Sequence, residues 1–63
     1  MEKEVYYKVY NGRNKLLLVT PKMANAVSLI EELTDLDLSE INFGVALNGS
    51  RFVEGYRVEK VKI

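Results

Sequence analysis

Residues 21–34 read PKMANAVSLIEELT, and this stretch predicts the helix around which the rest of the chain is arranged. Thr20 can cap the helix with its hydroxyl, and Pro21 suits the first helical position because its missing N–H has no partner there in any case. The apolar side chains recur at spacings of three and four, as in an amphipathic helix: Met23, Ala26, Val27, Ile30 and Leu33. A helix of this length is marginal alone, so its apolar stripe must pack against the rest of the chain.

The composition indicates one small domain without the common catalytic chemistries. The chain has 63 residues, no cysteine and no histidine, which excludes disulfides, thiolate nucleophiles, Ser–His pairs and the usual zinc sites. Its four glycines do not form a phosphate-binding loop. We therefore expect a single domain over 1–63 that is not an enzyme and holds no cofactor or metal. The lack of cysteine fits a cytoplasmic location, and no apolar run has the length of a membrane-spanning helix.

The segment before the helix has the pattern of a β-hairpin. Val5 to Tyr10 is an aromatic and β-branched run, Asn11-Gly12 is a strong turn signal, and Lys15 to Val19 forms the return strand. In the first strand, Tyr6, Lys8 and Tyr10 share one face. The apolar run Leu16–Val19 does not alternate, which predicts burial on both faces, either in the centre of a sheet or under a partner.

The segment after the helix predicts a second hairpin. Apolar residues alternate with small or polar ones from Ile41 to Leu47, Asn48-Gly49 is again a turn signal, and Arg51 to about Lys62 returns. The predicted fold is therefore α+β, with the order hairpin–helix–hairpin (ββαββ) and one helix on one face of a four-stranded sheet. In this element order the chain resembles the β-grasp immunoglobulin-binding domains of bacteria, and the resemblance implies a fold but no function.

The stretch LSEINFGVALNGSRFVEGYRV, residues 38–58, also permits a helix from Glu40 to Asn48, capped by Ser39 and closed by Gly49. In this form it resembles the helix-turn-helix modules appended to intron-encoded nucleases, which end in a Gly-Tyr pair followed by a strand, like Gly55-Tyr56. That resemblance implies a DNA-binding accessory domain. Its candidate contact residues are Asn42, Asn48, Arg51 and Arg57. Gly44 inside a helix would cost about 1 kcal/mol relative to alanine, which favours the strand.

Two surfaces are candidate sites. The first is the sheet face away from the helix, with Tyr6, Lys8, Tyr10, Gly44, Ala46, Gly55 and Arg57, to which Leu17 adds an apolar side chain. Aromatic side chains beside cations can anchor a protein partner or stack nucleic-acid bases, and they can equally serve only to cover glycines in the sheet. The candidate partner-binding residues are Tyr6, Lys8, Tyr10, Leu17 and Arg57.

The second surface is an acidic run near the end of the helix. It consists of Glu31, Glu32, Asp35, Asp37 and Glu40. It is either a solvated face or a docking patch for a basic protein, whereas a calcium loop would need a different ligand spacing and a glycine at the sharp turn.

Charge and size together predict a small non-catalytic module that binds another protein or a second copy of itself. The nine basic and nine acidic residues give a net charge of zero, which argues against sequence-independent coating of nucleic acid. The charge is uneven, with +3 over residues 1–23, −5 over 31–40 and +2 over 41–63. An accessory, regulatory or inhibitor protein of the kind that phages and mobile elements encode fits this description, and we expect no contact with a membrane.

Overall fold

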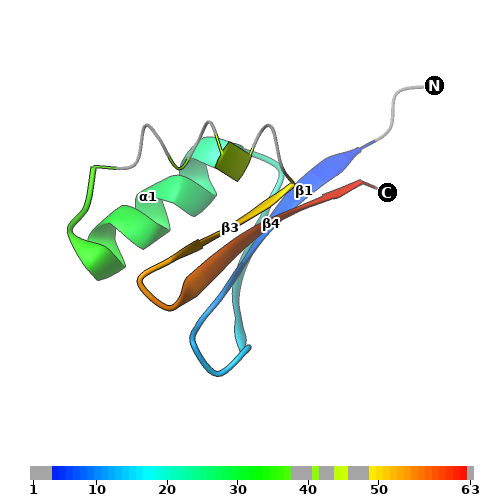
Figure 1. The fold of residues 1–63 in the computed structure, drawn as a ribbon. Coiled ribbons are helices and arrows are strands. Elements are labelled where there is room, and N and C mark those ends of the chain that lie inside the picture. Colours follow the sequence, from blue (N-terminus) through cyan, green and yellow to red (C-terminus); the bar gives the residue numbers. More distant parts are fainter. Residues whose placement is uncertain (1–3, 38–40, 42–43, 46–48, 63) are drawn as a thin grey trace.

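The fold is a four-stranded antiparallel sheet with a helix on one face. The computed structural model describes residues 4–37, 41, 44–45 and 49–62. Its elements are β1 (Val5–Tyr10), β2 (Leu16–Thr20), α1 (Met23–Thr34), β3 (Ser50–Val53) and β4 (Tyr56–Lys62), as Figure 1 shows. The predicted α+β class and ββαββ order are confirmed.

The strands lie in the order β2-β1-β4-β3, and each neighbouring pair is antiparallel. β1 and β4 therefore form the centre of the sheet, while β2 and β3 form its edges. The prediction that the run Leu16–Val19 lies in the centre of the sheet is wrong, because β2 is an edge strand with one neighbouring strand. Its alternative, burial under a partner, stays a prediction. Leu16, Leu17 and Val19 are 46%, 40% and 47% exposed.

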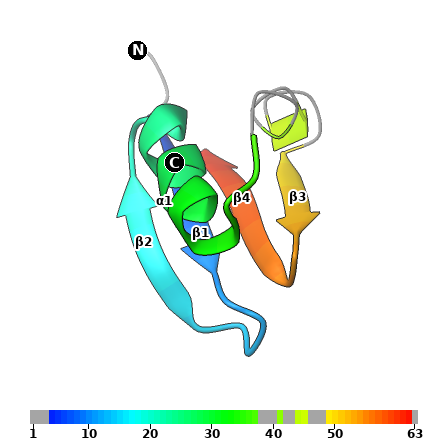
Figure 2. The ribbon, with the colours of Figure 1, turned by 90° about the vertical axis from the view of Figure 1, so that its left-hand side faces the viewer.

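The helix packs through the predicted apolar stripe. Ala26, Val27 and Ile30 are buried, and α1 contacts β1, β2 and β4. Val9 and Val58, which face each other on the central strands, are buried in the same core. Figure 2 shows α1 lying over the part of the sheet formed by β2, β1 and β4.

The start and the end of α1 differ in detail from the prediction. The helix begins at Met23 rather than at Pro21. The buried hydroxyl of Thr20 accepts a hydrogen bond of 3.2 Å from the backbone N–H of Lys22, just before the first helical residue. Leu33, which was predicted to belong to the packed stripe, is 45% exposed. The hydroxyl of Thr20 therefore bonds just outside the helix, and the packed stripe is shorter than predicted.

The second hairpin lies later in the chain than the sequence predicted. Both of its strands fall within residues 50–62, and the turn between them is Glu54-Gly55. Ile41, Gly44 and Val45 have helical backbone conformation, so the strand predicted from Ile41 to Leu47 is wrong at these positions. The residues between them, and Ala46 to Asn48, lie outside the described part.

The helical residues before β3 complete the core. Ile41 is 6% exposed and Val45 is 0% exposed, and both belong to the same buried cluster as Val53 of β3. Figure 2 places this yellow-green helical turn over the β3 side of the sheet. Gly49 has a φ of +81° and donates its N–H to the carbonyl of Val45 at 3.1 Å, which is how a glycine ends a helix. Gly49 is therefore not the turn of a hairpin.

Candidate functional site

The strand register determines which side chains share the face of the sheet away from α1, which we call the open face. Residues directly opposite each other on neighbouring strands share a face. Tyr10 lies opposite Leu16 on one side and opposite Arg57 on the other, and Arg57 lies opposite Phe52. Leu16, Tyr10, Arg57 and Phe52 thus cross all four strands, and we call them the aromatic row.

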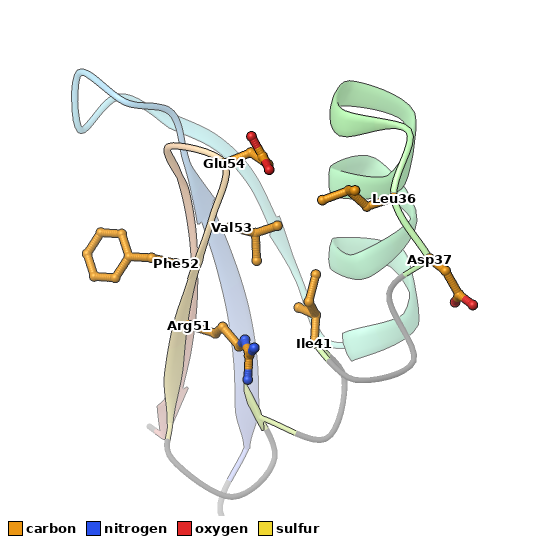
Figure 3. A pocket seen from close by; sticks show the side chains of 7 residues that line it. All are labelled: Leu36, Asp37, Ile41, Arg51, Phe52, Val53 and Glu54. Atoms are coloured by element: carbon orange, nitrogen blue, oxygen red, sulfur yellow. The ribbon is translucent and has the colours of Figure 1, made fainter.

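The aromatic row contains an arginine side chain stacked on a tyrosine ring, and an exposed phenylalanine. The guanidinium carbon of Arg57 lies 4.2 Å from the centre of the Tyr10 ring, a cation–π contact. The Nε atom of Arg57 is buried without a hydrogen-bond partner. Phe52 is 72% exposed, and Figure 3 shows it projecting from the sheet on the side away from Ile41 and α1. Aromatic residues and arginine are both enriched in the centres of protein interfaces.

The other open-face positions are more polar. Lys8 lies opposite Glu59 on one side and opposite Val19 on the other. Opposite charges facing each other across a sheet attract, so Lys8 has an acidic neighbour. In the aromatic row, no acidic residue lies opposite Arg57, whose two strand neighbours are Tyr10 and Phe52.

Tyr6 is also on the open face, opposite Val61. Its hydroxyl donates a hydrogen bond of 2.9 Å to the Glu4 carboxylate. This hydrogen bond, together with the negative charge of Glu4, raises the pKa of Tyr6 above its ordinary value of 10.0. The neutral, donating form of Tyr6 is therefore the one that the open face presents.

The structure brings most of the predicted partner-binding residues together. Tyr6, Lys8, Tyr10 and Arg57 share the open face through their register. Leu17 lies at an irregularity of β2, because Val9 pairs with Leu18 whereas Tyr10 pairs with Leu16. Leu16, rather than Leu17, is therefore aligned with Tyr10.

The predicted glycines do not belong to the open face. Gly44 is buried in the helical segment, where a Cβ atom would come within 2.7 Å of the Arg51 side chain. Gly55 lies in the turn with a φ of +85°, and Ala46 lies outside the described residues. The prediction that the tyrosines cover sheet glycines is therefore wrong at Gly44 and Gly55.

Sequence reasoning missed Phe52 as a surface residue. The continuous return strand predicted from Arg51 to about Lys62 would put Phe52 on the same face as Tyr56 and Val58. The two-residue turn at Glu54-Gly55 folds the chain back, so that Phe52 faces the same way as Arg57. Gly55, which tolerates the positive φ of +85°, was the available signal for this turn.

The free edge of β2, residues 16–20, is a second apolar feature, which we call the β2 edge. A strand at the edge of a sheet presents unpaired backbone N–H and C=O groups to any further strand. Edge strands are commonly protected by charged residues, but β2 reads LLLVT and carries none. Its pairing with β1 is regular from Leu18 to Thr20. The β2 edge is thus both apolar and geometrically suited to pairing over this part.

The face toward α1 contains an open pocket of about 350 Å³. Figure 3 shows Arg51 and Val53 extending from β3 toward this side, where Ile41 also lies. Arg51 lies opposite Val58, whereas Arg57 lies opposite Phe52, so the two arginines belong to opposite faces of the sheet. The predicted DNA-contact residues Arg51 and Arg57 therefore do not form one surface. Asn42 and Asn48 lie outside the described residues.

The predicted acidic run is exposed where the structure describes it. Glu31, Glu32, Asp35 and Asp37 lie at or just after the end of α1 and are all exposed, and Glu40 lies outside the described part. Asp35 ends the helix with a φ of +58° and donates its N–H to the carbonyl of Glu31 at 2.7 Å. Among the described residues, no three acidic side chains gather as a metal site would require.

No helix in the described ranges has the length and apolar character needed to cross a membrane. No protein-family model matches the chain, and no curated protein or solved structure gives a significant match.

Proposed function

We propose that this chain is a small protein-binding module whose contact surface is the open face, with the aromatic row at its centre. The observation that carries the proposal is the 72% exposure of Phe52 beside an arginine held on Tyr10. Burying a phenylalanine is worth about 1.5–3 kcal/mol, and arginine and tyrosine are among the residues enriched at the energetic centres of interfaces. A partner would gain this energy without having to reorganise the sheet.

The aromatic row also indicates the chemistry of the partner. Arg57 has no acidic residue opposite it in its row, whereas Lys8 faces Glu59. Stacking on Tyr10 restricts the guanidinium before binding, so less conformational entropy is lost when it pairs. A partner segment with apolar side chains over Phe52 and Leu16, and with a carboxylate at Arg57, complements this surface.

A displayed library of random peptides provides a test that does not require the partner to be known. We expect selected peptides to combine an acidic residue with apolar ones, and to perturb the NMR signals of Tyr10, Arg57 and Phe52. Phe52→Ala and Arg57→Ala should each weaken binding by about tenfold or more, the size of effect found at interface centres. Leu33→Ala is the matched control, because Leu33 is an exposed apolar residue on α1, away from the open face.

Two results would contradict the proposal. Peptides that perturb another surface, or that bind Phe52→Ala as tightly as the parent protein, would move the site elsewhere. A library that yields no binder to the parent protein would leave the aromatic row without the proposed role.

DNA binding is the second candidate, and the helical conformation of Ile41, Gly44 and Val45 favours it. Arg51 and Arg57 lie on opposite faces of the sheet, which counts against the predicted set of DNA-contact residues. Because the net charge is zero, we expect no sequence-independent micromolar affinity for duplex DNA at physiological salt. Fluorescence anisotropy with labelled duplexes over a range of salt concentrations tests this. Tight binding that weakens steeply with salt would replace the protein-binding proposal with the DNA-binding one.

A further inference from the structure

We propose that two copies of the chain pack open face against open face about a two-fold axis, with Arg57 of each copy over Glu59 of the other. The inference rests on the proposed function, because it names a second copy of the chain as a partner of the open face. It starts from the strand register, which places a second row of side chains beside the aromatic row. This row, which we call the charged row, consists of Val19, Lys8, Glu59 and Ser50.

The two rows are neighbours on the open face. Arg57 and Glu59 are two residues apart on β4, and their side chains therefore point to the same side of the sheet. Tyr10 and Lys8 have the same relationship on β1. The pairing of β1 with β4 is regular over all the residue pairs from Val5 to Tyr10. The positions of these four side chains therefore do not depend on the irregularity in β2.

A two-fold axis between two facing sheets, perpendicular to the strands and level with Val58, exchanges the two rows. The aromatic row of one copy then lies over the charged row of the other, with each strand over its equivalent. On β4, Arg57 meets Glu59 of the second copy in an ion pair. On β1, Tyr10 meets Lys8 of the second copy in a cation–π contact. Facing sheets lie about 10 Å apart, a gap that two long side chains can span.

Charge favours a second copy as the occupant of the open face. The strand neighbours of Arg57 are Tyr10 and Phe52, and neither is acidic. Covering a cation with a partner is strongly unfavourable unless an anion pairs with it. The second copy supplies this anion, because Glu59 is the acidic residue among the described strand positions of the open face. Symmetry makes the ion pair occur twice in the dimer.

An axis parallel to the strands is the alternative for two facing sheets. It would stack the aromatic rows on each other and place Lys8 over Glu59 of the second copy. Both Arg57 side chains would then be covered without a carboxylate over them, which is costly. The perpendicular axis gives each Arg57 an anion, so the charges favour that arrangement.

The size of the open face limits the strength of the dimer. Four strands about 4.8 Å apart and six residues at about 3.4 Å each give a face of roughly 20 Å by 20 Å. In projection this is roughly 400 Å², compared with about 800 Å² per partner in a standard interface. We therefore expect a weak, reversible dimer that forms as the concentration rises.

Sedimentation velocity and NMR over a range of concentrations, up to millimolar, test the inference. The parent chain should move from the 7.2 kDa monomer toward twice that mass. Its NMR signals from the open-face residues of β1 and β4 should shift with concentration, whereas those of α1 should not. Arg57→Glu and Glu59→Arg each replace the ion pair with two like charges. Each variant should therefore lower the association constant by about tenfold or more.

Mixing the two variants tests the arrangement. In a mixed dimer the new glutamate of one chain faces the new arginine of the other, and the native Glu59 faces the native Arg57. Association in the mixture should therefore exceed that of either variant alone. Under the parallel axis, position 59 would face Lys8, and mixing would bring no gain over Arg57→Glu alone. Glu32→Arg is the matched control, because it makes the same charge change on an exposed residue of α1 and should leave the association constant unchanged.

Three outcomes would overturn the inference. A parent chain that stays monomeric at millimolar concentration excludes the dimer. Concentration-dependent NMR shifts that are confined to α1 or the β2 edge move the interface away from the open face, and this result requires no variant. A mixture that associates no better than Arg57→Glu alone excludes the arrangement.

Failure of the dimer is distinguishable from failure of the proposed function. The selected peptides and Phe52→Ala test the proposed function separately. A monomeric parent chain that binds these peptides through Phe52 would exclude the second copy as the partner and leave the proposed function in place.

Discussion

Replacing Glu54 with asparagine should stabilise the protein. Glu54 and Gly55 form the two-residue turn of the second hairpin, with φ values of +50° and +85°. Two successive positive φ values define the hairpin turn that favours Asn-Gly. Glutamate has no side-chain group that makes this backbone conformation favourable, whereas asparagine adopts it readily.

The structure sets the size of the expected gain. A non-glycine residue in the left-handed region costs roughly 1–2 kcal/mol. Asparagine should recover about half of this, or about 0.5–1 kcal/mol, which corresponds to an increase in Tm of about 2–8 °C for a domain of this size. The total stability of 63 residues is expected to be only about 3–9 kcal/mol, so the change is measurable.

Urea denaturation followed by circular dichroism provides the assay. The midpoint should rise for Glu54→Asn at an unchanged m-value, and Glu54→Val should lower it because a β-branched residue resists positive φ. If the hairpin instead turned at Asn48-Gly49, Glu54 would lie within a strand, where asparagine is disfavoured. A lower midpoint for Glu54→Asn would therefore refute the reasoning and the position of the turn.

Three further changes test other parts of the fold. Ile30→Ala removes a fully buried side chain and should cost about 2–5 kcal/mol in urea denaturation; a cost below this range would show that Ile30 is not in a close-packed core. Asp35→Gly should raise the free energy of unfolding by about 1 kcal/mol, because it relieves the positive φ at the end of α1 and removes an anion there, and an unchanged free energy of unfolding would contradict both effects. Glu4→Gln should lower the pKa of Tyr6 toward 10.0 in an NMR titration. The hydrogen bond to Glu4 favours the neutral phenol of Tyr6. Its contribution to the stability of the fold is therefore present below pH 10.0 and is lost as the pH rises through the raised pKa of Tyr6. An unchanged pKa of Tyr6 in Glu4→Gln would contradict the assigned cause.

The sequence predicted the first hairpin and α1 because each carries local signals that agree with its tertiary environment. Ala26, Val27 and Ile30 are buried as the helical spacing requires. β1 and β2 pair around the predicted Asn11-Gly12 loop. In these segments, the periodicity and the turn residues favour one structure only.

The second hairpin was misplaced because its signals fit two structures. Ile41 and Val45 are four residues apart, which satisfies both a period of two and a helical turn. Gly49 supplies a positive φ, which a hairpin turn and a helix end both require. The true turn, Glu54-Gly55, has only one residue that prefers its conformation, so the sequence signal for it was weak.

Only part of the candidate site could be predicted from the sequence. Tyr6, Lys8 and Tyr10 alternate within β1, so their shared face follows from the sequence alone. The contact of Arg57 with Tyr10, and the exposure of Phe52, depend on the pairing of β4 with β1 and β3. Such cross-strand neighbours depend on the register, which the sequence alone did not indicate here.

The two edges of the sheet are not equivalent, and this bears on whether copies of the chain could add to one another without limit. A sheet that offered two good edges could add copies indefinitely and form fibres. β3, at the end opposite β2, has four residues, and one of them is Arg51. A short strand with a charged residue is a poor template for another strand. The β3 edge is therefore expected to resist pairing with a further strand, which should keep the sheet from growing at both ends.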